Sequence, residues 1–205
     1  MKGRPYAISG LIFFLSMGLL SLPTRGGELA SPETKLYFFK ARTWDSISSS
    51  TDQLNGRYEV AVSNGKAEEV NTVTDGEKRL IGGNAAGEIA RMVGIDPANR
   101  MYINPPLEVD KTWSQSYSYT IPGINRLWRR SVNYKVVSEE TLTTPAGTFN
   151  VFKLEATSRT GDGTNQKWIY YYSKDIDCVV KWFYDSGVGI KGAKVEIELE
   201  KLEVR

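Results

Sequence analysis

The sequence predicts a mainly β fold, in which a strongly curved antiparallel sheet forms a half-barrel or partial barrel with one short helix. From Lys35 onward, β-branched and aromatic residues alternate with polar residues in short runs separated by turn residues, which is typical of antiparallel strands. Helical spacing appears in a single segment. Two strands also change the parity of their apolar positions, which predicts bulges, and bulges bend a sheet.

Two turns organise the first half of the predicted sheet. Asn64-Gly65 fits a type I′ hairpin, because both residues can adopt the positive φ that this turn requires, and Asp75-Gly76 marks a second turn. The short helix follows, with Asn84 as its cap and Gly94 near its end. The strands around these turns are expected at 35–44, 56–63, 66–73 and 77–81.

The second half begins at Asn104-Pro105-Pro106, which forces an extended entry into a strand with Trp113, Tyr117 and Tyr119 on one face. No internal repeat is visible, so we expect residues 27–205 to form a single curved antiparallel β domain. Further strands are expected around 129–143, 148–158, 166–173, 178–184 and 193–204.

Two of these strands change phase along their length. In the last one, the apolar residues share one parity from Ala193 to Leu199 and the other parity at Leu202 and Val204. A regular strand could not keep both sets on one face, so we expect a bulge near Glu200-Lys201 and, by the same argument, a second at Val151-Phe152. The bulges should place on the buried side Phe149, Phe152, Leu154, Ile197, Leu199 and Leu202.

A proline and a glycine interrupt the strand pattern in the segment Pro145–Phe149. Pro145 cannot donate a hydrogen bond to a ladder, and Gly147 can adopt backbone angles that are closed to other residues. The segment therefore suits a tight reversal between two long strands.

Three segments resemble, in order, a bacterial exported domain of unknown function: "PPLEVDKTW", "VVSEETLTTPAGTFNVFKLEA" and "WIYYYSKDIDCVVKW". They correspond to a Pro-Leu-x-Val-Gly-x-x-Trp start, a Val-Pro-Ala-Gly-Thr-Phe turn and a Trp-Tyr-Ser-Pro-x-Val-Gly-x-Val-Lys strand pair. The chain departs from this pattern at Asp110 and Asp177, which replace glycine, at Thr144, which replaces valine, and at Lys174, which replaces proline.

The resemblance covers roughly Pro105 to Val204 and implies a shape. Members of this group look related to lipoprotein carriers of the LolA and LppX type, in which a curved antiparallel sheet wraps a short helical lid around an apolar cavity. A shared shape does not by itself establish a shared function.

The N-terminus has the pattern of a signal peptide over residues 1–26. Lys2 and Arg4 give a positive start, an apolar run follows over residues 7–22, and Pro23 ends it. The run is shorter and richer in glycine than a membrane-spanning helix of about 20 apolar residues. We therefore expect cleavage and a periplasmic or secreted protein with no stable membrane span, and an inner-membrane signal anchor is the alternative.

Charge and residue usage exclude several functions. Cleavage after Gly26 would remove three of the 26 basic residues and leave 23 against 24 acidic ones, so the net charge would change from +2 to −1. A chain with this nearly balanced charge is not expected to bind nucleic acid. The chain has no histidine, which excludes histidine-dependent catalysis and imidazole metal ligands. The single cysteine, Cys178, is in phase with Val180 and Trp182 and is expected to be a buried hydrophobe. We expect no catalytic residue, no metal and no cofactor.

Aromatic residues form the first candidate site. Those on the strands alternate along the chain, and the apolar residues of the short helix could close one end of the sheet over them. The alternative is that the rings fill an ordinary core. The residues expected to line a pocket for a lipid or another apolar ligand are Ile89, Met92, Trp113, Tyr117, Trp168, Tyr170 and Trp182.

Charged residues form two further candidates. Glu196, Glu198 and Glu200 lie in one row of the last strand, where they could attract a cationic partner or, as we expect, keep an edge strand from pairing with other chains. Arginines around Trp128 could grip a phosphate or an anionic lipid headgroup, although such clusters are more often solvated turns. These arginines are Arg126, Arg129 and Arg130.

The sequence thus favours a non-enzymatic periplasmic protein that binds an apolar or amphipathic, lipid-like ligand in a half-barrel cavity. The alternative is a structural interaction module that docks an exported envelope partner through a sheet edge and has no ligand cavity. A third class, a glycan hydrolase that uses carboxylates alone, requires two acids facing each other across a cleft.

The signal peptide gives a direct prediction. N-terminal sequencing of the exported protein should begin between Gly26 and Ser31, because small residues that suit cleavage follow the apolar run there. Recovery of intact Met1 in a membrane fraction would instead identify a signal anchor.

Overall fold

The computed structural model describes residues 33–44, 54–82, 89–93, 103–120, 127–159, 165–187 and 194–205. All of these lie in one compact unit, Pro32–Arg205. The predicted signal peptide lies outside the described residues, and so does most of the expected helix.

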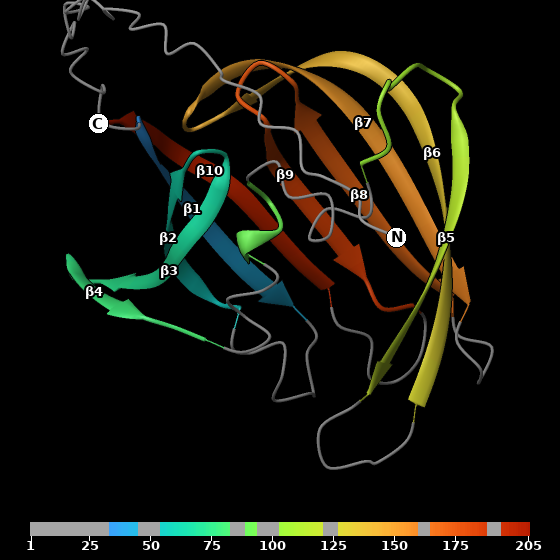
Figure 1. Cartoon of the computed structure of the whole chain (residues 1–205), viewed down its shortest axis with the longest axis horizontal. Helices are drawn as coiled ribbons and strands as arrows, with labels where there is room; N and C mark the ends of the chain where they lie inside the picture. The colour runs from blue at the N-terminus through green and yellow to red at the C-terminus, as the bar shows by residue number, and fades with distance from the viewer. Residues whose placement is uncertain are drawn as a thin grey trace, which may run out of the picture. The chain divides into compact units, whose positions relative to one another are not determined.

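Ten strands in the described residues form one antiparallel sheet: β1 (Thr34–Trp44), β2 (Gly56–Ser63), β3 (Lys66–Thr74), β4 (Glu77–Leu80), β5 (Thr112–Thr120), β6 (Leu127–Thr144), β7 (Gly147–Arg159), β8 (Asn165–Ser173), β9 (Cys178–Asp185) and β10 (Lys194–Val204). Their spatial order is β4-β3-β2-β1-β10-β9-β8-β7-β6-β5, so the sheet is open and β4 and β5 are its edges (Figure 1). The predicted fold class, a curved and open antiparallel sheet, is confirmed.

The sheet consists of two meanders, β1–β4 and β5–β10, in which strands that follow each other in the chain lie side by side. The pairing of β1 with β10 joins them, with Ala41 opposite Ile197 near the middle of the ladder. Beyond the last pair of the ladder, Thr34 and Arg205 exchange backbone hydrogen bonds of 3.0 and 2.9 Å.

Both predicted hairpin turns are present and have the predicted backbone. Asn64 and Gly65 adopt φ values of 51° and 74° between β2 and β3, and Asp75 and Gly76 adopt 51° and 84° between β3 and β4. Two positive φ angles in a two-residue connection match the right-handed twist of the flanking strands.

The reversal between β6 and β7 also has the predicted form. Thr144 lies opposite Gly147 across a two-residue turn. Gly147 has a φ of 138°, which residues other than glycine rarely adopt. The Ala146 amide donates a 3.2 Å hydrogen bond to the buried Thr144 hydroxyl, so threonine stabilises the turn at this departure from the resembling motif.

Two aspartates occupy positions where the resembling motifs have glycine. Asp110 has a φ of 68° and Asp177 a φ of 48°, both in the left-handed region that glycine enters freely and aspartate tolerates. The backbone at these departures is therefore one that either residue type can adopt.

One of the two predicted bulges is confirmed. Phe38 pairs with Lys201 and Phe39 with Leu199, which leaves Glu200 of β10 without an opposite residue. The bulge allows Leu199, which is fully buried, and Leu202, which is half-buried, to pack on the same core despite their different parity.

The other bulge lies on a different strand from the one predicted. The register between β6 and β7 shifts between Val136 and Ser138, whereas β7 pairs without interruption through Val151 and Phe152. The bulge predicted at Val151-Phe152 is therefore wrong. Both of these residues are nevertheless buried, at 1% and 4% exposure.

Strands β5 to β10 have one buried face and one solvent face. Across five strands, one row of paired residues on the buried face consists of Val136, Leu154, Tyr170, Trp182 and Ile197. The solvent face carries residues such as Lys135, Glu155 and Glu198. Of the six residues predicted to be buried, Phe152, Leu154, Ile197 and Leu199 are buried, and Phe149 and Leu202 are half-buried.

The described part of the expected helix is a single turn. Ile89 and Ala90 are helical, and the Met92 amide donates a 3.0 Å hydrogen bond to the Ile89 carbonyl. The turn is tied to the sheet, because the Val179 amide donates to the Met92 carbonyl at 2.8 Å and Val93 bridges Cys178. No described helix is long and apolar enough to cross a membrane.

Two core residues test the assignment of the faces. Leu154→Ala and Ile197→Ala should each lower the free energy of unfolding by about 2–5 kcal/mol, because both side chains have no exposed surface and their truncation leaves cavities. Urea denaturation followed by circular dichroism measures this. Val137→Ala, which truncates the exposed bulge residue of β6, is the control and should change stability by less than about 1 kcal/mol. Equal effects for all three variants would contradict the assignment.

Candidate functional site

The buried face of β5 to β9 changes in character along the strands. Its innermost row, described above, is apolar at Val136 and Leu154. The next row toward the β5–β6 connection, here called the aromatic row, consists of Trp113, Tyr134, Ala156, Trp168 and Tyr184. One step further, Gln115 lies opposite Val132, and Ser158 lies opposite Gln166. The face therefore changes from apolar to aromatic to polar toward one end.

The aromatic rings of this face stack on one another. Ring centroids lie 5.2 Å apart for Trp113 and Tyr134, and 5.3 Å apart for Trp168 and Tyr184. Trp182 stacks on Tyr184 at 6.2 Å and on Tyr170 at 6.5 Å. Such offset stacks hold the rings in fixed orientations and present a rigid aromatic surface.

Four buried polar atoms on this face have no hydrogen-bond partner among the described residues: Trp113 Nε1, Gln115 Oε1, Gln166 Oε1 and Trp182 Nε1. The Gln166 amide nitrogen donates a 3.0 Å hydrogen bond to the Tyr184 hydroxyl. This bond fixes the Gln166 side chain, whose carbonyl oxygen has no partner among the described residues. Buried donors and acceptors are nearly always satisfied in proteins. Two donors and two acceptors of this face are therefore left unsatisfied by the described residues.

Arg130 is the charged side chain that the described residues of β5 to β9 place at the polar end of this face. Its guanidinium lies 5.9 Å from the centroid of the Trp168 ring, within the range of a cation–π contact. Arg130 is half-buried, whereas the adjacent Arg129 is exposed on the solvent face, because neighbours in a strand point to opposite sides. The predicted arginine cluster is therefore divided between two faces, and Arg126 and the Trp128 side chain lie outside the described structure.

The structure places the predicted pocket residues in two groups. Trp113, Trp168, Tyr170 and Trp182 lie together on the buried face, where Trp168 and Trp182 are buried and the other two half-buried. Met92 is buried beside Val179 at the start of β9, at the other end of that strand from Tyr184, and Ile89 is buried in the same segment. The Tyr117 side chain is outside the described structure, although its position is in β5.

Sequence reasoning did not identify the polar part of this face. Gln115 has the parity of Trp113, and Gln166 has the parity of Trp168. The sequence does contain a signal for this polar end, because Gln115 and Gln166 are polar residues at positions where the strand pattern predicts apolar ones.

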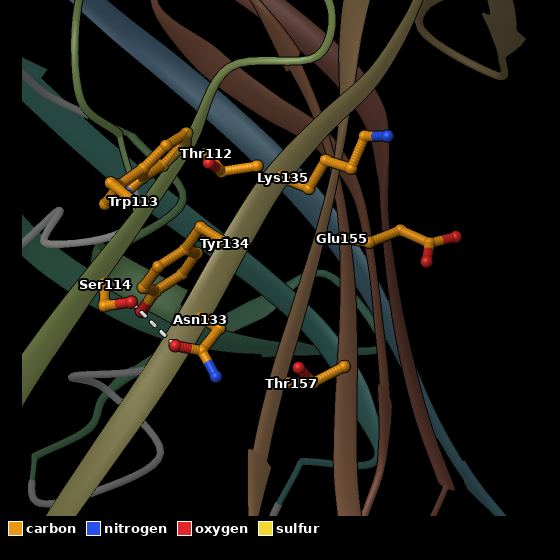
Figure 2. A pocket seen from close by; sticks show the side chains of 8 residues that line it. All are labelled: Thr112, Trp113, Ser114, Asn133, Tyr134, Lys135, Glu155 and Thr157. Carbon is orange, nitrogen blue, oxygen red and sulfur yellow. Dashed lines mark hydrogen bonds between the residues drawn. The ribbon is translucent and has the colours of Figure 1, made fainter.

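A pocket of about 400 Å³ lies at β5 to β7, and most of the residues that line it have polar side chains. Figure 2 shows Trp113 and Tyr134 on one side of β6, and Lys135 and Glu155 on the other. The Ser114 hydroxyl donates to Asn133 Oδ1 at 2.7 Å (Figure 2). Lys135 pairs with Asp110 at 2.8 Å, and Glu155 with Lys167 at 3.2 Å. Of the residues predicted to line an apolar pocket, the lining of this pocket includes Trp113 alone, so it does not match that prediction.

The carboxylate row of β10 was expected to protect an edge strand. This expectation is wrong, because β10 lies between β1 and β9. Lys181 of β9 reaches both Glu196 and Glu198, and Arg57 of β2 pairs with Glu200 at 3.0 Å. The row is therefore neutralised by cations from neighbouring strands. Burial opposes the charge on Lys181, but hydrogen bonds and attraction to the two carboxylates outweigh it and raise the Lys181 pKa above its usual 10.5.

No group of histidine, cysteine, aspartate or glutamate side chains in the described structure could hold a metal ion. Cys178 is fully buried, as predicted. Asp177 accepts a 2.7 Å hydrogen bond from the Tyr172 hydroxyl, which gives this carboxylate a structural role in the β8–β9 turn.

No family model matches the chain, and no curated protein matches it. Solved structures that are similar to this chain include the hypothetical lipoprotein YmcC from Escherichia coli (K12). It is 15% identical and has a TM-score of 0.40, with 84% of this chain and 85% of that chain covered. A candidate exported protein with a YmcC-like fold from Bacteroides fragilis NCTC 9343 is 14% identical, with a TM-score of 0.34 and coverage of 82% and 95%. A candidate lipoprotein from Parabacteroides distasonis ATCC 8503 is 11% identical, with a TM-score of 0.35 and coverage of 82% and 94%. These similarities are too low to assign a function.

The carboxylate row gives a pH-dependent prediction. Lys181→Met should destabilise the protein at pH 7 by about 0.5–1 kcal/mol, because Glu196 and Glu198 lose a shared cation at a partly solvated site. A raised pKa in the folded state stabilises the fold below the unfolded-state pKa, and this contribution is lost as the pH rises through the folded-state value.

The difference in unfolding free energy between the wild type and Lys181→Met should therefore shrink as the pH rises above 10.5. Urea titrations at pH 7, 9 and 11 measure it, and Lys66→Met at an exposed turn-flanking position is the control. A difference that stays constant up to pH 11 would show that the lysine charge is not responsible.

Proposed function

We propose that the protein is a non-enzymatic, exported binding protein of the bacterial envelope that holds an amphipathic, lipid-like ligand on the buried face of β5 to β9. The N-terminal signal-peptide pattern supports export. The resemblance of the Pro-Ala-Gly-Thr-Phe segment to exported domains supports the same location. The change from apolar to polar residues along the buried face is the observation that supports an amphipathic ligand.

The three rows of this face match the parts of an amphiphile. An acyl chain would lie against the half-buried rings of Trp113, Tyr170 and Tyr184, where burial of apolar surface contributes about 25 cal/mol per Å². The polar group would lie at the end with Gln115 and Gln166, whose carbonyl oxygens would accept hydrogen bonds from hydroxyl or amide groups of the ligand, while an anionic group would pair with a cation. An apolar ligand with no polar group would leave these atoms unsatisfied, so the geometry favours an amphiphile over a hydrocarbon.

Arg130, the cation that the described residues place at this end, selects the sign of the headgroup. A guanidinium binds carboxylate and phosphate oxygens through two parallel hydrogen bonds, and Arg130 already lies against the aromatic surface that would hold the chain. We therefore expect anionic headgroups to be preferred over cationic ones of the same chain length.

The second candidate function is the docking of an envelope protein through a sheet edge. It is supported by the composition of β5, an edge strand of nine residues with no charged side chain. Exposed strand edges usually carry charges, prolines or bulges that prevent pairing. Native mass spectrometry of the protein purified from its own envelope separates the two functions, since a bound lipid supports the first and a second polypeptide the second.

Matched amphiphiles test the proposed ligand class. Laurate should change tryptophan emission saturably below its micelle concentration, and dodecyltrimethylammonium should bind at least about tenfold more weakly, because only the anion can pair with Arg130. Arg130→Gln should remove this preference.

Arg129→Gln is the matched control, because it removes the same charge from the adjacent residue on the other face. It should leave laurate binding within about twofold of the wild type. The proposal fails if laurate gives no saturable change, or if the two arginine variants weaken binding equally.

A further inference from the structure

The two edges of the sheet differ in how well they resist pairing. β4 has four residues, Glu77–Leu80, three of which are charged, so its edge is short and blunted. β5 has nine residues, Thr112–Thr120, with no charge and no proline. Among the described residues, β5 pairs only with β6, which leaves its outer edge open.

The hydrogen bonds to β6 define which backbone groups of β5 face outward. The Val136 amide donates to the Lys111 carbonyl at 2.9 Å, and the Val136 carbonyl accepts from the Asp110 amide at 2.9 Å. Both groups of Val136 therefore point toward β5, and so do those of every second residue of β6 before it. The β5 residues opposite them have odd numbers, so the amides and carbonyls of Ser114, Ser116 and Ser118 point to the open edge.

The sequence of β5 is close to a palindrome around Ser116. Reading "TWSQSYSYT" from both ends pairs Thr112 with Thr120, Trp113 with Tyr119, and Ser114 with Ser118. Gln115 and Tyr117 form the one unlike pair. When a strand pairs antiparallel with a second copy of itself, residues at equal distances on either side of the central residue lie opposite each other, because the two copies run in opposite directions.

We propose that the open edge of β5 pairs with β5 of a second copy of this chain, around a two-fold axis at Ser116. Ser116 would exchange two backbone hydrogen bonds with Ser116 of the partner subunit, because its amide and carbonyl both face the open edge. The same holds for Ser114 and Ser118 of the partner subunit. The result is one continuous sheet through both copies, with a self-complementary interface of the kind that two-fold dimers use.

The cross-strand neighbours in this register are favourable. On the solvent face, threonine would lie opposite threonine and serine opposite serine, pairs that form hydrogen bonds across strands. On the other face, Trp113 would be opposite Tyr119 of the partner subunit, an aromatic pair. No like charges meet along the strand, since β5 contains none.

A second copy fits this edge better than an unrelated strand. Among the registers that bring outward-facing backbone groups opposite each other, the one centred on Ser116 matches every serine and threonine with its own kind. This inference names the partner in the docking function and does not depend on amphiphile binding, which uses Arg130 and the rows of the buried face.

Sedimentation velocity of the full chain across a concentration series tests the pairing. The wild type should show a monomer–dimer equilibrium, because nine strand residues and their neighbours bury less area than a permanent interface does. Ser116→Lys should weaken dimerisation by at least about tenfold, since it brings two like charges together at the two-fold axis. High salt should partly restore dimerisation of this variant by screening.

Two further variants separate loss of pairing from loss of folding. Ser116→Pro removes an amide that faces the open edge and takes no part in the β5–β6 ladder, so it should abolish the dimer and keep the circular dichroism spectrum. The double variant Ser114→Lys with Ser118→Glu brings opposite charges together across the axis and should dimerise at least as well as the wild type. Thr141→Lys, on an exposed part of β6, is the control and should have no effect.

A wild type that stays monomeric over the whole concentration range, or a dimer that persists in both Ser116 variants, would overturn the pairing. Hydrogen exchange locates the interface independently. The amides of Ser114, Ser116 and Ser118 should become protected as the dimer forms. Laurate titrations of the same samples report on the ligand proposal separately, so the failure of one proposal is distinguishable from the failure of the other.

Discussion

The ladder between β1 and β10 is the interaction on which the rest of the structure depends. All other neighbouring strands are joined by the chain in sequence order, so local connections bring them together. The β1–β10 pair must instead close most of the chain into a loop, at an entropic cost that local pairs do not incur. Phe39 and Ala41 on β1, and Ile197 and Leu199 on β10, offset this cost by their nearly complete burial along the ladder.

The alternation of apolar and polar residues was sufficient to predict the strands, because a pleated strand with one buried face imposes it directly. The turns at Asn64-Gly65 and Asp75-Gly76 were predictable for a similar reason, since they require backbone angles that few residues allow. The bulge at Glu200 could also be predicted, because both parities occur within one strand. The bulge beside β7 could not, since it lies at Val137 on the partner strand and depends on the register between the two.

The order of the strands in space was the main limit on predicting the site. Parity brought Trp113, Trp168 and Trp182 to one face, but no local signal says which strands are neighbours. The carboxylates of β10 fit an edge strand by sequence alone, and only the spatial order shows that β10 lies inside the sheet. The polar end of the buried face was missed for a related reason, because Gln115 and Gln166 are informative only once they are known to lie on the same face of one sheet.

The reciprocal hydrogen bonds between Thr34 and Arg205 place the two ends of the sheet-forming chain beside each other. Ends in this arrangement can be joined by a short linker without stretching either strand. New ends could then be opened in the exposed turn at Asp75-Gly76, where no buried backbone would be cut. The sheet is thus suited to circular permutation, in which the ladder between β1 and β10 becomes an ordinary hairpin and β3 and β4 become the strands that must find each other through space.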